Sequence, residues 1–327
     1  MAVKTDVSAD LAFLDGKRGE MTARLKDWCA INSGSYNVEG LTRMRAALRA
    51  CFSELGAEVE EATADRQTPV TAQGELENRF VSPALHIVQR PQAPVRVLLA
   101  GHMDTVFGAD HPFQSARLID GDTLNAPGAA DMKGGLLVML FALQAVERSR
   151  LADRIGYEIV INADEEIGSP GSARLMTEAA RRAQFACLYE PALADGTLAG
   201  ARKGSGNFSA IIRGRSAHAG RDPHLGRNAI VAAAEFVSRL AALSGKREGL
   251  TVNVAKIEGG GPNNVVPDLA VISFNARPDL AEDADWFEAE ARAILDDIGG
   301  REGYDAHLHG GFNRPPKPMT PALEAFF

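Results

Sequence analysis

Strand-like and helix-like stretches alternate as far as residue 203, and this alternation restricts the chain to few folds. Apolar stretches typical of strands occur at 80–89, 95–101 and 156–162, and the last two flank 133–148 (KGGLLVMLFALQAVER), which predicts a long, largely buried helix. Further expected elements are helices at 8–34, 40–55 and 170–182, the last with Ser169 as N-cap and Pro170 at its first position, and a strand at 185–190. Strands alternating with helices predict an α/β unit with a mostly parallel sheet covered by helices on both faces.

The order of elements changes near residue 204. From there we expect a strand, a helix, two strands, a helix and a strand, at 206–213, 228–243, 250–258, 269–277, 281–298 and 304–309. This βαββαβ order is that of the ferredoxin-like α+β unit, a four-stranded antiparallel sheet with two helices on one face. The sequence therefore predicts one domain at 1–203, a second at 204–311, and at 312–327 a Pro/Gly-rich return linker followed by the start of another segment.

Charge and cysteine content exclude several kinds of partner. A net charge of -8 over 327 residues argues against nucleic acid or an anionic membrane. Cys29, Cys51 and Cys187 are odd in number and far apart, which fits neither a disulfide framework nor a cysteine-based zinc motif. The first residues lack the apolar run of a signal peptide, and no apolar stretch approaches the roughly 18 residues needed to cross a bilayer. We expect a cytoplasmic protein with no membrane partner.

Potential metal ligands follow the predicted strands. His102 and Asp104 stand two apart beyond the strand 95–101, so on extended backbone they point to the same side. A neutral imidazole can bind a metal while a nearby carboxylate holds the ring in one tautomer, although a hydrogen-bonded loop histidine would show the same pattern. Asp131 lies in the glycine-rich NAPGAADMKGG that leads into the helix 133–148, where an acid could equally serve as the N-cap.

A run of three acids, Asp164-Glu165-Glu166, follows the strand-like YEIVINA. Neighbouring side chains on extended backbone project to opposite sides, so one glutamate can bind a metal while the other faces the substrate as a base. Three adjacent acids repel one another unless cations balance them, and a solvated acidic loop remains the alternative. Glu190 ends a further apolar strand. One histidine with several carboxylates and no cysteine favours zinc, manganese or cobalt in a hydrolytic site.

Six segments resemble, in order and over nearly the whole chain, the motifs of the zinc aminoacylase/carboxypeptidase family: GHMDTV, GAADMKGG, ADEEIGSPGS, YEPA, RKGSGNF and GRSAHAGRDPHLGRNAI. Its members include bacterial glutamate carboxypeptidase, succinyl-diaminopimelate desuccinylase and acetylornithine deacetylase. The resemblance is closest to the glutamate carboxypeptidases, especially around His218. It implies that 1–203 is a metal-binding catalytic domain and that 204–311 is an inserted lid and dimerisation domain.

The resemblance implies a site for two zinc ions. Asp131 would bridge both ions, and the peptide bond that follows it would be cis. His102 and Glu190 would complete one zinc position. Glu166 would bind the other zinc, and Asp104 would orient His102. Manganese or cobalt could replace zinc in such a carboxylate-rich site.

The activity that the resemblance implies is that of a metallopeptidase or amidohydrolase. Glu165 would be the general base, taking a proton from a metal-bridged water and passing it to the leaving amine. The scissile amide would lie next to a free carboxylate, as in glutamate carboxypeptidases. Deacylation of an N-acyl amino acid is the close alternative, and a non-catalytic relative that keeps fold and dimer is another. The exact substrate and native metal stay open.

Three residues of the second domain match family positions that face the substrate. His218 would reach the active site across a homodimer interface and stabilise the developing oxyanion. Without the resemblance, a lone histidine at such a turn would be structural. Asn264 and Arg277 would help hold the substrate, with Arg277 suited to a bidentate grip on a terminal carboxylate. A surface salt bridge is the alternative for Arg277.

One ligand of the family site has no counterpart in this sequence. In the family, a final segment after the small domain ends with another zinc-binding histidine, whereas nothing follows ALEAFF (322–327). One zinc would then keep three protein ligands, which suffice for a catalytic ion, and the other would keep two, which rarely suffice. We therefore expect a fragment of an enzyme, with impaired activity and an uncovered apolar sheet surface. His307 and His309 are expected on the surface rather than in this role.

Overall fold

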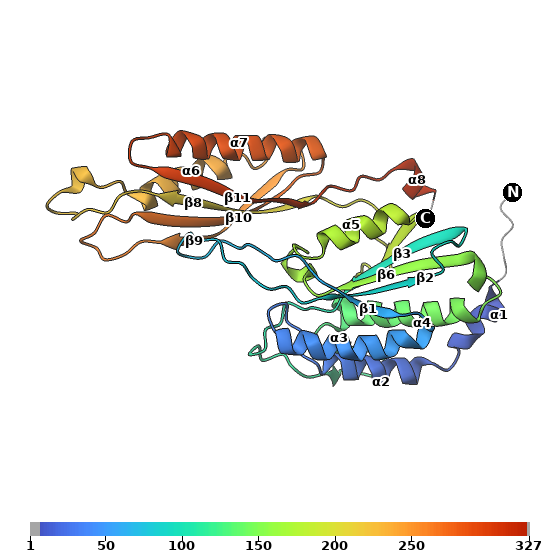
Figure 1. Cartoon of the computed structure of the whole chain (residues 1–327). Coiled ribbons are helices and arrows are strands. Elements are labelled where there is room, and N and C mark those ends of the chain that lie inside the picture. The colour runs from blue at the N-terminus through green and yellow to red at the C-terminus, as the bar shows by residue number, and fades with distance from the viewer. Residues whose placement is uncertain (1–6, 326–327) are drawn as a thin grey trace. The chain divides into compact units, whose positions relative to one another are not determined.

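The computed structural model describes residues 7–325 and divides the chain into two units (Figure 1). The first unit comprises Met1–Gln67 and Phe80–Ala192, and the second comprises Thr68–Arg79 and Leu193–Phe327. The boundaries predicted from the sequence differ from this division, because 68–79, 193–203 and 312–327 all fall in the second unit.

Local contacts explain why segments outside 204–311 belong to the second unit. In the loop 68–79, the carbonyl of Gly74 accepts a hydrogen bond from Arg213 Nη2 at 2.9 Å. Near the C-terminus, Lys317 and Arg202 exchange two backbone hydrogen bonds of 2.8 Å. Periodicity does not predict pairings of this kind, because the paired segments are too short to show a repeat.

The first unit is built on a mixed sheet of five strands in the order β1-β2-β6-β3-β7. The strands are β1 (Val59–Ala62), β2 (Ala84–Gln89), β3 (Val95–His102), β6 (Ile155–Asn162) and β7 (Phe185–Leu188). β3 is parallel to β6 and β7, whereas β2 is antiparallel to β1 and β6. The sequence predicted a mostly parallel sheet. The antiparallel part arises because the connection from β2 to β3 is too short for a helical crossover and simply reverses the chain.

Helices cover both faces of this sheet. α2 (Arg18–Cys29), α3 (Val38–Phe52) and α4 (Gly134–Arg148) lie on one face, and α5 (Ala173–Arg182) lies on the other (Figure 1). The apolar side chains predicted at helical spacing in α3 are fully buried, namely Leu41, Met44, Leu48 and Phe52. The edge strand β7 leaves Phe185 and Leu188 exposed.

The first unit also contains several short elements. They are α1 (Ser8–Leu11), η1 (Ala12–Leu14), η2 (Ser53–Leu55), η3 (Ala129–Lys133), η4 (Ala152–Arg154), η5 (Glu165–Ile167) and a hairpin of β4 (Arg117–Leu118) and β5 (Leu124–Asn125).

Three local expectations were wrong. The helix predicted at 8–34 is interrupted, because Gly16 adopts a φ of +76° and turns the chain between η1 and α2. α5 begins at Ala173 with Ser172 at its N-cap position, since Ser169 has a φ of +57° and cannot start a helix. A segment long and apolar enough to cross a membrane does exist, at Ala129–Arg148, but 56% of its most apolar stretch is buried inside the protein, as expected of a core helix.

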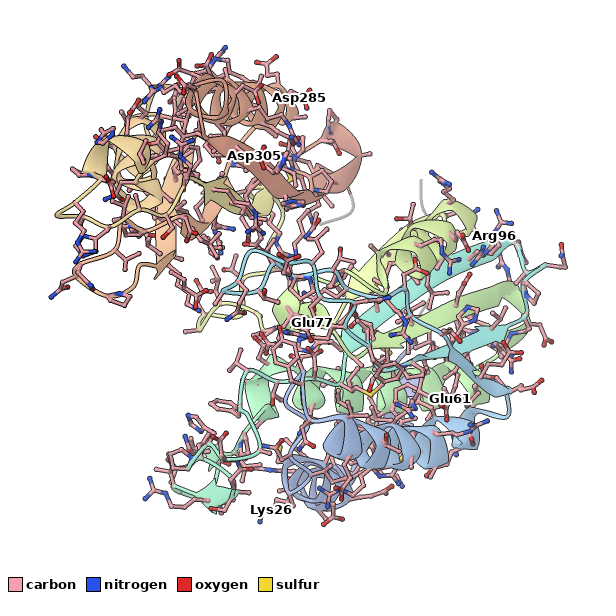
Figure 2. The ribbon with its side chains drawn as sticks, turned by 60° about the vertical axis from the view of Figure 1, so that its left-hand side comes forward. Lys26, Glu61, Glu77, Arg96, Asp285 and Asp305 are labelled. Carbon is pink, nitrogen blue, oxygen red and sulfur yellow. The ribbon has the colours of Figure 1, made fainter. Side chains whose placement is uncertain are left out.

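Ion pairs hold the charged edge strand β1 in place. Glu61 of β1, labelled in Figure 2, accepts hydrogen bonds from Arg45 Nε at 2.9 Å and from Arg49 Nη1 at 3.2 Å, both on α3. Arg45 is buried and needs a partner for its charge, which the partly exposed Glu61 carboxylate provides. These contacts explain why a strand too polar to be predicted from the sequence still joins the sheet.

The second unit has the predicted βαββαβ order. Its elements are β8 (Ser205–Arg213), α6 (Ala229–Ala241), β9 (Thr251–Gly259), β10 (Leu269–Arg277), α7 (Ala281–Gly299) and β11 (Asp305–Arg314), with the short η6 (Pro223–Leu225) and α8 (Pro321–Glu324). The sheet order is β11-β8-β10-β9, every pair is antiparallel, and α6 and α7 pack on one face (Figure 1). Phe208 and Phe274 stack in the core with ring centroids 5.2 Å apart. Of the helix predicted at ALEAFF, residues 326 and 327 lie outside the described residues.

Candidate metal centre

His102 is the last residue of β3 and is only 1% exposed. Its Nδ1 lies 3.0 Å from the backbone carbonyl oxygen of Asp104 and 3.3 Å from an oxygen of the Asp104 carboxylate. A carbonyl oxygen can only accept a hydrogen bond, so Nδ1 carries a proton, and in the neutral ring that a metal binds the lone pair lies on Nε2. The backbone of Asp104, more than its side chain, therefore sets the tautomer that a metal ligand needs.

Two carboxylates face His102 Nε2. An oxygen of Asp131 lies 2.9 Å away and an oxygen of Glu190 lies 3.7 Å away. Potential ligand atoms of His102, Asp131 and Glu190 all lie within 4.8 Å of one another. Parallel pairing of β3 with β7 brings these groups together, because Glu190 follows β7 at the edge of the sheet where β3 ends. One nitrogen and two carboxylate donors, partly open to solvent at Asp131 and Glu190, fit a divalent ion such as zinc with a position left for substrate.

Electrostatics at this cluster follow from its excess of acids. Burial alone would lower the pKa of His102, but hydrogen bonds to Asp104, Asp131 and Glu190 outweigh it and raise that pKa. The same contact with His102 lowers the pKa of Asp131. Asp131 is not the N-cap of α4, the alternative role that the sequence allowed, because Lys133 holds the N-cap position and no side chain makes a hydrogen bond there.

Asp104 connects the cluster to the two glutamates of η5. Its fully buried carboxylate accepts hydrogen bonds from the backbone N–H groups of Glu165 and Glu166, each at 3.2 Å. It also accepts one from Ser35 Oγ at 2.7 Å. Sequence reasoning missed Ser35. The only signal was its place in the turn-like NSGSYN, which does not indicate a contact with a residue so distant in the chain.

Glu165 and Glu166 do not lie on extended backbone, as the sequence suggested. They begin the single 3₁₀ turn η5, and both side chains are half-buried. Burial, followed by the charge of Asp131, raises the pKa of Glu166 to about 7. The charge of Asp131 therefore influences Glu166, although Glu166 is not one of the three potential ligands His102, Asp131 and Glu190. A cation bound nearby would favour its charged form.

Asp164 does not contribute a third charge to the site, contrary to the expectation that cations balance three adjacent acids. It is fully buried and accepts hydrogen bonds from Gly171 N at 2.7 Å, Ser172 N at 3.1 Å and Ser172 Oγ at 2.6 Å. Burial raises the pKa of Asp164 in spite of these bonds. The Asp164 side chain therefore joins the two ends of the loop that carries Glu165 and Glu166. Because the N–H groups of Gly171 and Ser172 donate to this side chain, α5 begins at Ala173 and not at residue 170 as predicted.

Replacing Asp164 by Ala should lower the free energy of unfolding by about 3 kcal/mol, because three buried donors would lose their acceptor. Urea unfolding would measure the change. Asp153→Ala removes an exposed aspartate from the same unit and should stay within about 0.5 kcal/mol of the wild type. Equal stability of the two variants would contradict the role given to Asp164.

Close backbone packing positions the loop that carries Asp131. The Asp131–Met132 peptide bond is cis, as the resemblance implied. Lys133 is 1% exposed and donates to the carbonyl of Ile31 at 2.9 Å, and its burial lowers its pKa to about 8. A Cβ at Gly135 would lie 1.9 Å from the carbonyl oxygen of Tyr189, so only glycine lets the start of α4 approach the residue before Glu190.

The second unit places His218 and Asn264 together and Arg277 apart from them. The turns that carry His218 and Asn264 are joined, since Ala219 N donates to the carbonyl of Asn264 at 2.9 Å. His218 is exposed, and its Nδ1 accepts from the N–H groups of Gly220 and Arg221 at 3.1 Å. Arg277 is the last residue of β10, whereas the turns that carry His218 and Asn264 lie at the other end of this strand, before Leu269. The length of β10, about 26 Å, therefore separates Arg277 from the two turns.

Comparison with known proteins supports the fold and the second unit. Residues 200–302 match the model of the peptidase dimerisation domain. Carboxypeptidase G2 of Pseudomonas sp. (strain RS-16) is 33% identical over 190 residues, which are 58% of this chain and 46% of that protein. Acetylornithine deacetylase of Myxococcus xanthus is 30% identical over 245 residues, 64% of this chain and 61% of that protein. The chain thus spans between about half and three fifths of these relatives.

Solved structures of other proteins show the same fold. An M20 family metallo-carboxypeptidase from Sulfolobus solfataricus superposes with a TM-score of 0.65 at 18% sequence identity, covering 91% of this chain and 79% of that chain. At this level of identity the likeness establishes the fold alone.

Proposed function

We infer from the match to the peptidase dimerisation domain and from the similarity to carboxypeptidase G2 that the chain is a relative of the M20 peptidases, and we propose that it is a metal-dependent hydrolase of amide bonds that lie next to a free carboxylate. The observation that carries the proposal is the cluster of His102, Asp131 and Glu190, in which Nδ1 of the histidine donates to a backbone carbonyl and Nε2 faces the two carboxylates. Such a donor set is typical of hydrolytic zinc sites, and manganese or cobalt would also fit.

The residues around the cluster have separate tasks in this proposal. An ion held by the three donors would polarise the scissile carbonyl and make water a better nucleophile near neutral pH. Glu165 takes the proton from the attacking water and delivers it to the leaving amine. Asp104 keeps Glu165 in place through its backbone N–H and keeps His102 in its tautomer. Glu166 offers a further carboxylate for a second ion.

We further propose a homodimer through the second unit. His218 Nδ1 accepts two backbone hydrogen bonds, so its proton sits on Nε2, where it can donate to a developing oxyanion. Asn264 lies beside it and would hold the substrate. Arg277 would bind the substrate carboxylate, but it lies at the other end of β10 from His218. Two residues so far apart cannot serve one substrate from the same protomer, which supports sharing of sites between protomers.

The proposal is tested by a hydrolysis screen of the chain loaded with zinc, manganese or cobalt. The substrates would be N-acyl-glutamates, N-acetylornithine and dipeptides with free carboxylates. Release of free amine only from metal-loaded protein would support the proposal, and amine release from N-acetylornithine alone would favour the deacylase alternative, in line with the similarity to acetylornithine deacetylase. If no metal binds to the wild-type chain, the proposal is wrong. Analytical ultracentrifugation would measure the oligomeric state.

A further inference from the structure

A pocket of about 310 Å³ lies on the sheet of the first unit, at the end of the sheet away from the metal centre. Arg96, labelled in Figure 2, lines this pocket and is the second residue of β3, whereas His102 is the last residue of the same strand. This length of strand separates the two by about 20 Å. The volume is at the small end of the range for small-molecule sites. The pocket is therefore separate from the metal centre.

The register of the strands explains which side chains surround the pocket. Val88 on β2 pairs with Glu158 on β6, and Arg96 on β3 pairs with Gly156 on β6. Paired residues project from the same face of a sheet, and so do residues two apart on one strand, so all four positions share one face. Glu158 is bonded to Arg182, the last residue of α5, so this is the face that α5 covers. Because α5 ends there and Gly156 has no side chain, the face stays open above Gly156.

Glu158 is the one acid among the described residues that line the pocket, and its charge is already paired. It is 8% exposed, and its carboxylate accepts hydrogen bonds from Arg182 Nε at 3.0 Å and Nη2 at 2.6 Å, and from His86 Nε2 at 2.8 Å. Burial would raise the pKa of Glu158, but the hydrogen bonds from Arg182 and His86 outweigh it and lower that pKa. The negative charge of Glu158 is therefore compensated within the pocket wall.

Arg96 adds a positive charge to this wall. Within the described range 7–325, no residue forms an ion pair or hydrogen bond with its side chain, and only its backbone is bonded, to Gln184. Arg182 uses two of its five N–H groups on Glu158 and keeps the others. Two arginines against one glutamate leave the wall with a net positive charge. An anion is favoured there, and a carboxylate most of all, because its two oxygens match the fork of a guanidinium.

Apolar surface lies beside these charges. Val88 is 42% exposed, although it projects from the sheet face that α5 covers elsewhere. Pro91, in the loop after β2, also lines the pocket. Covering such apolar surface stabilises a complex in proportion to the area removed from water. A ligand that uses the whole pocket would therefore have both an anionic group and an apolar body.

We propose that this pocket is a second binding site of the first unit, for a small organic carboxylate with an apolar body. The carboxylate lies above Gly156 and binds Arg96 and Arg182, and the apolar body lies on Val88 and Pro91. Backbone pairing of β2, β6 and β3 fixes the wall before a ligand enters, so little ordering cost remains for binding. The inference goes beyond the proposed function, since none of these residues belongs to the metal cluster.

Ligand binding to the full chain tests the inference without requiring turnover. Titration calorimetry would compare 3-phenylpropanoate with 3-phenylpropanamide, which has nearly the same shape and no charge. We expect the carboxylate to bind more tightly than the amide, equally with and without zinc. Arg96→Gln should weaken binding of the carboxylate about fivefold, the upper end for an exposed ion pair, and leave binding of the amide within about twofold of the wild type. Val88→Ala should weaken both compounds, because it removes apolar contact surface and no charge.

Arg181→Gln is the matched control, because Arg181 is exposed on α5, next to Arg182, and does not line the pocket. Its replacement should leave binding of both compounds unchanged. Equal affinity for the carboxylate and the amide, or unchanged carboxylate affinity in Arg96→Gln, would overturn the inference. So would binding that requires zinc, since the metal centre would then hold the carboxylate. Tighter binding of inorganic phosphate than of 3-phenylpropanoate would also overturn it, since the apolar wall would then have no part.

Discussion

Replacing Glu165 by Gln should lower metal-dependent hydrolysis by about 10²–10⁴-fold, the usual contribution of a general base, while zinc affinity stays at the wild-type level. Gln has nearly the same shape but cannot take a proton from water. The backbone N–H of residue 165 would still donate to Asp104, so the loop should keep its position. The three donors of the cluster do not include Glu165, so the ion should remain bound. Initial rates with saturating zinc and a competition assay with a chromogenic chelator measure the two quantities.

Glu178→Gln is the matched control for this experiment. Glu178 lies on α5 at the surface of the same unit, where it pairs with Arg174, and its replacement should leave both rate and zinc affinity unchanged. Full activity of Glu165→Gln would assign the base elsewhere, with Glu166 as the next candidate. Loss of zinc together with activity would instead make Glu165 a ligand.

Replacing His102 by Ala should reduce zinc affinity by more than about a hundredfold. Changes to residues that merely support a ligand already cost about 10–100-fold, and His102 supplies the cluster's one nitrogen donor. The apo protein titrated with zinc in the presence of a competing chelator would give the affinity. Hydrolysis should fall with occupancy and recover partly at high zinc concentration.

Two further variants make this result specific. His86→Ala removes a histidine of β2, which is separated from β3 by β6 in the sheet. His86 contacts Glu158 at 2.8 Å and lies outside the cluster, so zinc affinity should not change. Glu190→Gln removes a ligand that is partly exposed, so it should lose zinc with less effect on folding than a change at the buried His102. Unchanged affinity in both His102→Ala and Glu190→Gln would exclude this cluster as the metal site.

The parts of the structure that were predicted correctly are those with local signals. The helical spacing of Leu41, Met44 and Leu48, the apolar run of α4 and the βαββαβ order each depend on residues close in sequence. The approach of His102, Asp131 and Glu190 was implied by the resemblance to a known family, and the structure brings these side chains together.

The parts that were missed depend on contacts between distant residues. Asp164 was expected to be a charged residue of the site together with Glu165 and Glu166. Its carboxylate instead accepts hydrogen bonds from backbone N–H groups seven and eight residues further along the chain. Ser35 reaches Asp104 across 69 residues of sequence. The polar strand β1 stays in the sheet because arginines of α3 pair with Glu61. Composition and periodicity carry no information about such pairings.

The three candidate ligands come from separate parts of the chain, and this has a consequence for unfolding. An ion bound by His102, Asp131 and Glu190 would hold together three residues that are far apart in the sequence. In the unfolded chain, bringing these residues together would close two long loops and cost conformational entropy. An ion that binds only the folded form adds about 2.7 kcal/mol of stability at a free concentration one hundred times its dissociation constant. The melting temperature of the first unit should therefore rise with zinc, whereas the second unit contributes none of these donors. Heat denaturation would thus report whether the site is filled before any substrate is known.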